Sequence, residues 1–283
     1  MMVIRKELAY LLLIFGAFYI GCESLSPVDV NDDYPVFIKR LEMNELRVLN
    51  DVYHQMNKGL ICSTLNEYGL TGFSRVLFPN DINPCLNREI EKQELIYDDD
   101  FLNLVKLKLF ENAAFTGTRE IESLTLAEIT SLDGCTICEG PDINNVPLQW
   151  KFTFEPQQVN GIIVSGTEVV VYLDSNGINR IWGNWYPVVD PGFIEFGSSE
   201  AKKSVVGMKV RYANETNQIF EQEITEDHIF EAPELRYVAV NVDAGLEIHK
   251  VWILKVLQHN TSQIRWNIFF STITGEVLEV KLL

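Results

Sequence analysis

The chain has 283 residues, of which 47% are apolar, and its mean hydropathy is close to zero. This composition supplies enough apolar material for a packed core and excludes wholesale disorder, while the length allows one large domain or two small ones. The formal net charge of −17 comes from 23 basic and 40 acidic residues. Such an acid excess argues against a nucleic-acid partner, because phosphate binding needs clustered Lys and Arg side chains.

The first 22 residues have the pattern of an export signal. Arg5 and Lys6 precede an uncharged run, Leu8–Gly21, which is shorter than the roughly 20 residues that a spanning helix needs. A short basic start followed by such a run is typical of a secretory signal peptide; a single transmembrane anchor is the alternative. The sequence Tyr19-Ile20-Gly21-Cys22 resembles a bacterial lipobox, with Tyr19 in the position where Leu is usual.

The lipobox resemblance implies that residues 1–21 are a lipoprotein signal peptide and that Cys22 is the site of lipid attachment, with palmitate among its acyl chains. We therefore expect an exported cell-envelope protein that is anchored to a bacterial membrane, first of all the outer membrane, by acyl chains rather than by a spanning helix. Residues 22–33 are polar, contain Pro27 and show no periodicity, which predicts a flexible tether.

The remaining cysteines form an even set of four: Cys62, Cys85, Cys135 and Cys138. Export to an oxidising compartment favours disulfides, and of the three possible pairings we favour Cys62–Cys85 with Cys135–Cys138. A redox role for the C-x-x-C sequence would require a helix start, whereas glycines flank it and a proline follows. A zinc site made by all four thiolates is the other alternative, which export makes less favourable.

The N-terminal half reads as mainly helical. Apolar residues recur at helical spacing from residue 37 to residue 56, and Gly59 is placed to end that helix. A second helix is predicted over residues 99–113, where the acidic triplet Asp98–Asp100 suits the helix start, with calcium binding as the alternative role. Apolar runs at 60–62 and 73–78 are strands or loops.

From Leu148 the pattern changes to that of strands. Residues 150–154 alternate, two β-branched runs fill 159–173, and Asn176-Gly177 predicts a type I′ hairpin turn into a strand over 178–182. Further on, a short helix capped by Ser198 and Ser199 precedes more alternating segments. These predict a helix over 200–206 and strands over 235–242, 248–257, 263–271 and 276–282. Early helices and late strands predict an α+β fold, with helices packed on one face of antiparallel sheet.

Two segments resemble propeptide modules. The sequence Val159-Asn160-Gly161-Ile162, followed by Gly166, Val169–Asp174 and Gly177, resembles the fungalysin/thermolysin propeptide (FTP) motif. The helix over 200–206 and the hairpin that ends in Phe270–Leu278 resemble a PepSY module, although that helix is short. The resemblance implies antiparallel sheet modules of cystatin-like or PepSY-like type. It divides the chain into an α-rich region (34–145), an FTP-like hairpin region (146–190) and a PepSY-like region (191–283).

In secreted metallopeptidase precursors, such modules assist folding of the catalytic domain and block its cleft. Here we expect no catalytic domain after Leu283, and the sequence contains no H-E-x-x-H, G-x-S-x-G or phosphate-binding glycine loop. The four histidines are predicted to be surface or strand-face residues rather than metal ligands: His54, His228, His249 and His259. No catalytic residue, metal or cofactor is expected.

Trp182, Trp185 and Tyr186 form an aromatic concentration on which a sugar or peptide could stack; packing in the core is the alternative. We therefore predict a non-enzymatic, lipid-anchored protein that binds a protein or peptide partner, with restraint of a secreted peptidase as the activity that the resemblance implies. The alternative is a lipoprotein that captures an oligosaccharide or peptide at the aromatic residues. For the first function, an edge of the hairpin Val159–Trp182 is the expected docking strand, and the acidic charge favours a basic partner.

Overall fold

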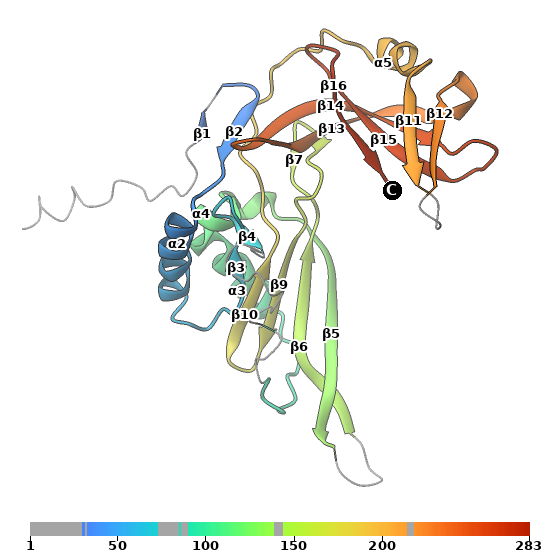
Figure 1. Ribbon diagram of the computed structural model, residues 1–283. Coiled ribbons are helices and arrows are strands. Elements are labelled where there is room, and N and C mark those ends of the chain that lie inside the picture. The colour runs from blue at the N-terminus through green and yellow to red at the C-terminus, as the bar shows by residue number, and fades with distance from the viewer. Residues whose placement is uncertain (1–29, 32, 73–84, 86–89, 139–143, 214–217) are drawn as a thin grey trace, which may run out of the picture.

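The computed structural model describes residues 30–31, 33–72, 85, 90–138, 144–213 and 218–283. Its architecture is α+β with antiparallel sheets, as the sequence predicts. Figure 1 shows a lower body, in which helices pack against one sheet, and an upper body built on a second sheet. Cys22 and the predicted signal peptide lie outside the described residues, and within those residues no helix is long and apolar enough to cross a membrane.

The lower body contains a four-stranded antiparallel sheet and the main helices. Its strands follow the order β10-β9-β6-β5, where β5 is Leu126–Ile137, β6 is Asn144–Phe154, β9 is Val169–Asp174 and β10 is Gly177–Trp182. The helical elements are α2 (Met43–Met56), α3 (Asp100–Glu111), α4 (Ala113–Thr116) and the 3-10 turn η2 (Ile121–Ser123). The short hairpin of β3 (Thr64–Leu65) with β4 (Thr71–Gly72) completes this half. The hairpin of β7 (Gln158–Val159) with β8 (Ile162–Ile163) reaches the upper body beside β13 (Ile229–Val242), where Val164 bridges to Tyr237 (Figure 1).

The upper body is a six-stranded sheet centred on β14 (Gly245–Leu257). Strand β13 (Ile229–Val242) runs along one side of β14, while β2 (Val36–Lys39) and β15 (Ile264–Ser271) share the other side. The sheet continues with β1 (Val30–Asn31) beyond β2 and β16 (Val277–Leu282) beyond β15. Helix α5 (Ser198–Val205), the hairpin of β11 (Lys209–Ala213) with β12 (Ile219–Glu223) and the 3-10 turn η3 (Glu226–His228) belong to the same half.

Four hydrophobic clusters hold these parts together, the smallest of which contains Val238, Val240, Val251, Ile253 and Phe269 of the upper sheet. In the lower body, Tyr53 and Leu109 from the helices are fully buried against Phe152 and Val171 of the sheet. In the upper body, α5 packs over Trp266 and its neighbours on β14 and β15. The third cluster lies between the two bodies and joins β2 and β14 to segments of the lower half. Its buried members are Val36, Ile38, Tyr68, Leu70, Val164, Tyr237, Leu246 and Ile248.

The first predicted helix, residues 37–56, is wrong in its N-terminal part. Residues 36–39 form β2, with Val36 and Ile38 buried, and they pair with residues 245–248 of β14. Helix α2 begins only after Glu42, whose backbone N–H donates to the Glu45 carboxylate at 3.0 Å. The far end agrees with the prediction, because Gly59 adopts a positive φ of 68° just beyond the helix.

The second predicted helix is confirmed as α3, with α4 following after Asn112. The acidic triplet caps it: the Asp98 carboxylate accepts the backbone N–H of Asp100 at 2.9 Å. No cluster of three or more His, Cys, Asp or Glu with metal-binding geometry occurs among the described residues, so nothing there supports the calcium alternative. At the junction with α4, Asn112 exchanges amide hydrogen bonds of 2.7 and 3.1 Å with Asn57 at the end of α2, and both side chains are buried.

The turn between β9 and β10 differs in type from the prediction. Only Gly177 has a positive φ there, at 108°, whereas a type I′ turn would require positive φ at both central residues. The Asp174 carboxylate closes the turn by accepting the backbone N–H of Asn176 and the amide of Asn179, at 2.8 and 2.7 Å. The late predicted strands are all present as β13 to β16, and α5 is capped by Glu200, which accepts the N–H of Gly197.

The structure places the regional boundaries differently from the resemblance. Residue 145 lies inside β6, so the α-rich region and the FTP-like region share one sheet through the β5–β6 pair. Residues 30–31, at the end of the predicted tether, form β1 and pair with residues 37–38 of β2. The upper sheet thus contains strands from both ends of the described chain, and residues 148–283 alone do not make a complete core.

Candidate functional site

Strand β16 lies at an edge of the upper sheet (Figure 1). Three of its apolar side chains are exposed there. Its apolar residues Val277, Val280 and Leu282 are 39%, 44% and 47% exposed. In register they stand opposite Phe270, Ile268 and Trp266, which are buried in the cluster beneath α5. This row, which we call the β16 strip, continues the core of the upper body to a sheet edge that α5 does not cover.

The backbone of β16 is oriented for strand addition. Leu283 N–H donates to the Arg265 carbonyl at 2.9 Å, and the pairing of Val280 with Ile268 follows the same register. In an antiparallel ladder, hydrogen-bonded and non-hydrogen-bonded pairs alternate. Val280 and Leu282 are therefore non-hydrogen-bonded positions, so their N–H and C=O groups point away from β15. In the part of the chain that the structure describes, no strand pairs with this outer edge.

The two edges of the lower sheet are less open. Strand β5 has three register shifts against β6 and carries exposed Glu128 and Asp133, features that oppose strand addition. The outer side of β10 is covered, because Asn179 C=O accepts the N–H of Cys62 at 2.8 Å and Ile181 N–H donates to the Ser63 hydroxyl at 3.0 Å. Strand β9 lies between β6 and β10. Within the hairpin Val159–Trp182, strands β9 and β10 therefore supply no free docking edge.

The three aromatic residues singled out from the sequence do not form one exposed cluster. Trp185 is 7% exposed and belongs to the core of the lower body, whereas Tyr186 packs against the cluster between the two bodies. Only Trp182, at 38%, is exposed. The chain turns at Gly183, which separates Trp182 from Trp185. Because Trp185 is buried in the core, the prediction that a ligand stacks on it is wrong.

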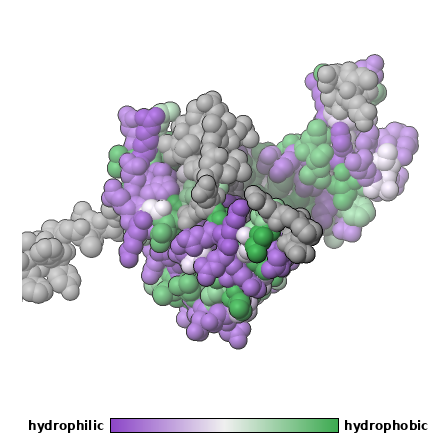
Figure 2. Space-filling model, turned by 90° about the horizontal axis from the view of Figure 1, so that it is seen from below, coloured by the Kyte–Doolittle hydropathy of each residue, from purple (hydrophilic) through white to green (hydrophobic). Residues whose placement is uncertain are grey.

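A small groove lies between α3 and the start of β10. Leu60, Leu104, Leu107 and Ile178 line it, and its volume is about 150 Å³. Pockets that enclose a drug-sized ligand have volumes of roughly 300–1,000 Å³, so this groove does not suit such a ligand. Figure 2, seen from below, shows polar and apolar side chains interspersed over this end of the molecule.

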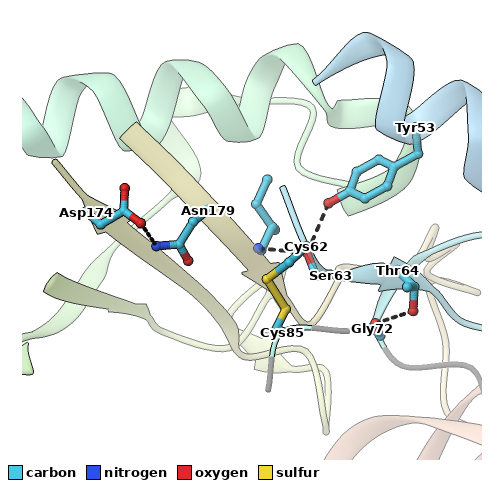
Figure 3. Close-up of a disulfide and its surroundings, with 9 residues drawn as sticks. Tyr53, Cys62, Ser63, Thr64, Gly72, Cys85, Asp174 and Asn179 are labelled. Carbon is cyan, nitrogen blue, oxygen red and sulfur yellow. Dashed lines mark hydrogen bonds between the residues drawn. A yellow bond between two sulfur atoms is a disulfide. The ribbon is translucent and has the colours of Figure 1, made fainter. Parts of the chain in front are cut away.

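Both favoured cysteine pairs are disulfide-bonded in the structure. Cys62 and Cys85 have a Cα–Cα distance of 5.1 Å, and the bridge lies beside β10 with Ser63, which also contacts the Tyr53 hydroxyl at 3.3 Å (Figure 3). A bridge over 23 residues stabilises a fold by about 3 kcal/mol through the unfolded chain. Cys135 and Cys138 are bonded at the far end of β5.

Two of the four histidines contact each other, which their spacing in the sequence does not indicate. His228 and His259 are 31 residues apart, and their ring nitrogens lie within 3.2 Å on the surface. His249 lies on β14 and bonds Glu247 at 2.8 Å, and His54 lies on α2. The prediction of surface or strand-face positions agrees with the structure.

Comparisons with known proteins return little. No protein family model matches the sequence. No curated protein matches it either. Among solved structures, the Bacillus megaterium YpeB C-terminal domain is similar over 70% of this chain and 69% of that chain, with 16% sequence identity and a TM-score of 0.28. A TM-score of this size is too low to assign a shared fold.

Proposed function

We propose that the chain is a non-enzymatic, lipid-anchored cell-envelope protein that binds an extended segment of a protein partner along the outer edge of β16. The observation that carries this proposal is the combination of outward-pointing backbone groups and the β16 strip at one sheet edge. An open, apolar edge invites pairing with another chain, and natural proteins blunt such edges unless they use them. The partner class is a protein or peptide.

Strand addition at this edge would pair the outward-pointing backbone groups and cover the apolar side chains of the β16 strip at the same time. The partner backbone would pair with the N–H and C=O groups of Val280 and Leu282. Its alternate side chains would cover the strip on the face that α5 leaves open. The net charge of −17 would favour a basic partner and speed the encounter at low ionic strength. The finer proposal, restraint of a secreted peptidase, is supported by the resemblance of residues 148–283 to propeptide modules.

Proline at position 280 tests the docking edge. The Val280 N–H points away from β15, so Val280→Pro removes a donor that only an added strand would use and leaves the β15–β16 ladder intact. We expect the full chain to bind at least one of the purified secreted metallopeptidases of its source organism in biolayer interferometry. Val280→Pro should weaken that binding by at least about tenfold, the effect of 1.4 kcal/mol.

The matched control is Val280→Thr, which keeps the N–H and the β-branched shape and should retain most of the binding. Circular dichroism must show that both variants are folded. Binding that is unchanged in Val280→Pro would contradict docking at this edge. If the wild-type chain neither binds nor inhibits any peptidase of the panel, restraint of a peptidase is wrong.

The anchor is tested separately. Cys22→Ser should abolish incorporation of alkyne-labelled palmitate and leave an uncut precursor or a soluble form, because the thiol accepts the lipid. Labelling in cells followed by membrane fractionation measures both effects. Acyl label that persists in the variant, together with unchanged extraction by detergent, contradicts the lipoprotein proposal while leaving the docking edge untouched.

A further inference from the structure

The open edge of β16 carries side chains of opposite charge on either side of its central position. Glu279 and Lys281 flank Val280, and all three side chains are exposed. In register, Glu279 stands opposite Phe269 of β15 and Lys281 stands opposite Asn267. Neither of these residues is charged, so β15 offers no ion pair across the strand to either side chain.

The hydrogen bonds between β15 and β16 determine which positions can pair with a further strand. Val280 directs its N–H and C=O groups away from β15, whereas the backbone groups of Glu279 and Lys281 point toward it. An added antiparallel strand would therefore form a hydrogen-bonded pair at Val280 and non-hydrogen-bonded pairs at its two neighbours. Side chains approach most closely across non-hydrogen-bonded pairs, so the charges at 279 and 281 select what stands opposite them.

A second copy of β16 meets these requirements in one symmetric register. With the two strands antiparallel about a two-fold axis at Val280, Glu279 of each copy stands opposite Lys281 of the other. The two Val280 residues then form the hydrogen-bonded pair between the copies. An axis at Glu279 or at Lys281 would instead place like charges directly opposite each other, which destabilises a sheet. The strand is therefore self-complementary in this register and self-repelling in the two adjacent ones.

We propose that, in the absence of another partner, the outer edge of β16 is capped by β16 of a second copy of the chain. The pairing joins two six-stranded sheets into one continuous antiparallel sheet. It places the two Val280 side chains next to each other and covers part of the β16 strip. Because a two-fold contact uses the same edge of both copies, the assembly closes at two and leaves no open edge of β16 for aggregation.

Capping by a second copy regulates the docking edge, and this consequence rests on the proposed function. A partner strand and a second copy both need the outward-pointing backbone groups of Val280 and Leu282, so they exclude each other. The contact is confined to one strand of each copy, which makes a small interface of the weak and reversible class. A partner that covers more of the strip therefore displaces the second copy.

The net charge of the chain gives self-association a characteristic salt dependence. Two copies that each carry −17 repel each other, and salt screens this repulsion beyond a Debye length of about 10 Å at 0.1 M ionic strength. The contacts between Glu279 and Lys281 are shorter than that length and are screened less. Self-association should thus strengthen as the ionic strength rises from low values, whereas binding of a basic partner should weaken.

Sedimentation equilibrium of the full chain, with the disulfides intact, tests the capping. We expect a monomer–dimer equilibrium at chain concentrations up to about 100 µM. Glu279→Lys and Lys281→Glu should each weaken the dimer by at least about tenfold, because each places two like-charged pairs across the axis. The matched control is Lys203→Glu, which makes the same change of net charge at an exposed position of α5 and should dimerise nearly as the wild type does.

Mixing the two single variants at β16 gives the most specific result. The Glu279→Lys chain has two positive side chains at these positions and the Lys281→Glu chain has two negative ones, so the mixture should form a heterodimer. The double variant, which exchanges the two charges, should self-associate as the wild type does. Hydrogen exchange gives a second readout: the Val280 amide should be protected in the wild-type dimer and exchange freely in either single variant.

A wild-type chain that stays monomeric over this concentration range overturns the proposal. Association that survives both single variants, or that leaves the Val280 amide unprotected, also overturns it, because the copies then meet at another surface. These outcomes do not affect docking of a different partner. Conversely, a dimer with the expected properties that binds no peptidase contradicts only the proposed function. Circular dichroism of each variant controls for folding.

Discussion

Replacing Asp190 with alanine should lower the free energy of unfolding by about 3–5 kcal/mol, the cost of leaving a buried charge without its partner. Asp190 lies in the segment that leads from β10 to α5, and its Oδ1 is 2.9 Å from Nζ of Lys250 on β14. The Lys250 side chain is 7% exposed, so in the variant its ammonium would remain buried and unpaired. Denaturation in urea, monitored by circular dichroism, measures the loss.

Lys250→Met should cost less, about 1–3 kcal/mol, because the carboxylate that remains keeps other donors. The Asn160 amide donates to Asp190 Oδ2 at 2.8 Å and the Gly192 N–H to Oδ1 at 3.0 Å, and the Asp190 side chain is 20% exposed. The double variant should be more stable than Asp190→Ala alone, since it leaves no buried charge. Equal losses in the two single variants would contradict this account of the pair.

A matched control is the pair between Lys209 and Glu221, whose side chains are 60% and 40% exposed. Lys209→Met should change stability by less than about 1 kcal/mol, because solvent screens exposed ion pairs. The contrast separates the effect of burial from that of removing a lysine.

The stabilisation that the Asp190–Lys250 pair contributes should depend on pH in a defined direction. The Lys250 ammonium, followed by the Asn160 amide and the Gly192 N–H, holds the pKa of Asp190 well below its usual range. A lowered pKa in the folded state means that the stabilisation is present above the unfolded-state pKa, near 4, and is lost as the pH falls below it. The stability difference between the wild type and Asp190→Ala should therefore narrow below about pH 4. A difference that stays constant down to pH 2 would count against this assignment.

The sequence predicts those parts of the fold that local patterns specify. Helix α3 and strands β13 to β16 follow from periodicity and from residues that cap or turn the chain. Strand β2 does not, because residues 36–39 become a strand only by pairing with residues 245–248 of β14, more than two hundred positions away. Strand β5 is missed for a related reason: Gly134, Asp133 and three bulges weaken its own strand pattern, and β6 supplies the pairing.

Site prediction fails where function depends on contacts between distant segments. The alternation of residues 277–282 indicates a strand, but no local signal indicates that its outer edge is open or that α5 leaves the strip exposed. The contact between His228 and His259 depends on two turns that only the assembled sheet brings together. Trp185 shows the opposite error, because a dense aromatic sequence is as compatible with core packing as with a binding surface.

Gly183→Ala should be the most damaging glycine-to-alanine change among the described residues, with a loss of about 4 kcal/mol or more, or failure to fold. Gly183 has a φ of +84°, and a Cβ atom there would lie 1.9 Å from the carbonyl oxygen of Glu168. That oxygen belongs to the backbone at the start of β9, so relief requires movement of strands rather than rotation of a side chain. The preceding residue, Trp182, already pairs with Val170 on β9, which restricts such movement.

Gly166→Ala is the control that isolates this clash. Gly166 also precedes β9 and has a similar φ of +76°, but nothing lies within 4 Å of an added Cβ. Its substitution should cost only the left-handed backbone penalty of about 1–2 kcal/mol. Urea denaturation of both variants, with equal m-values as evidence of two-state unfolding, gives the comparison. Gly183 lies where the chain leaves the lower sheet toward Asp190 and the upper sheet. Equal losses of stability at the two glycines would mean that the backbone at Gly183 shifts at little cost. The two bodies would then be joined less rigidly than the buried cluster between them indicates.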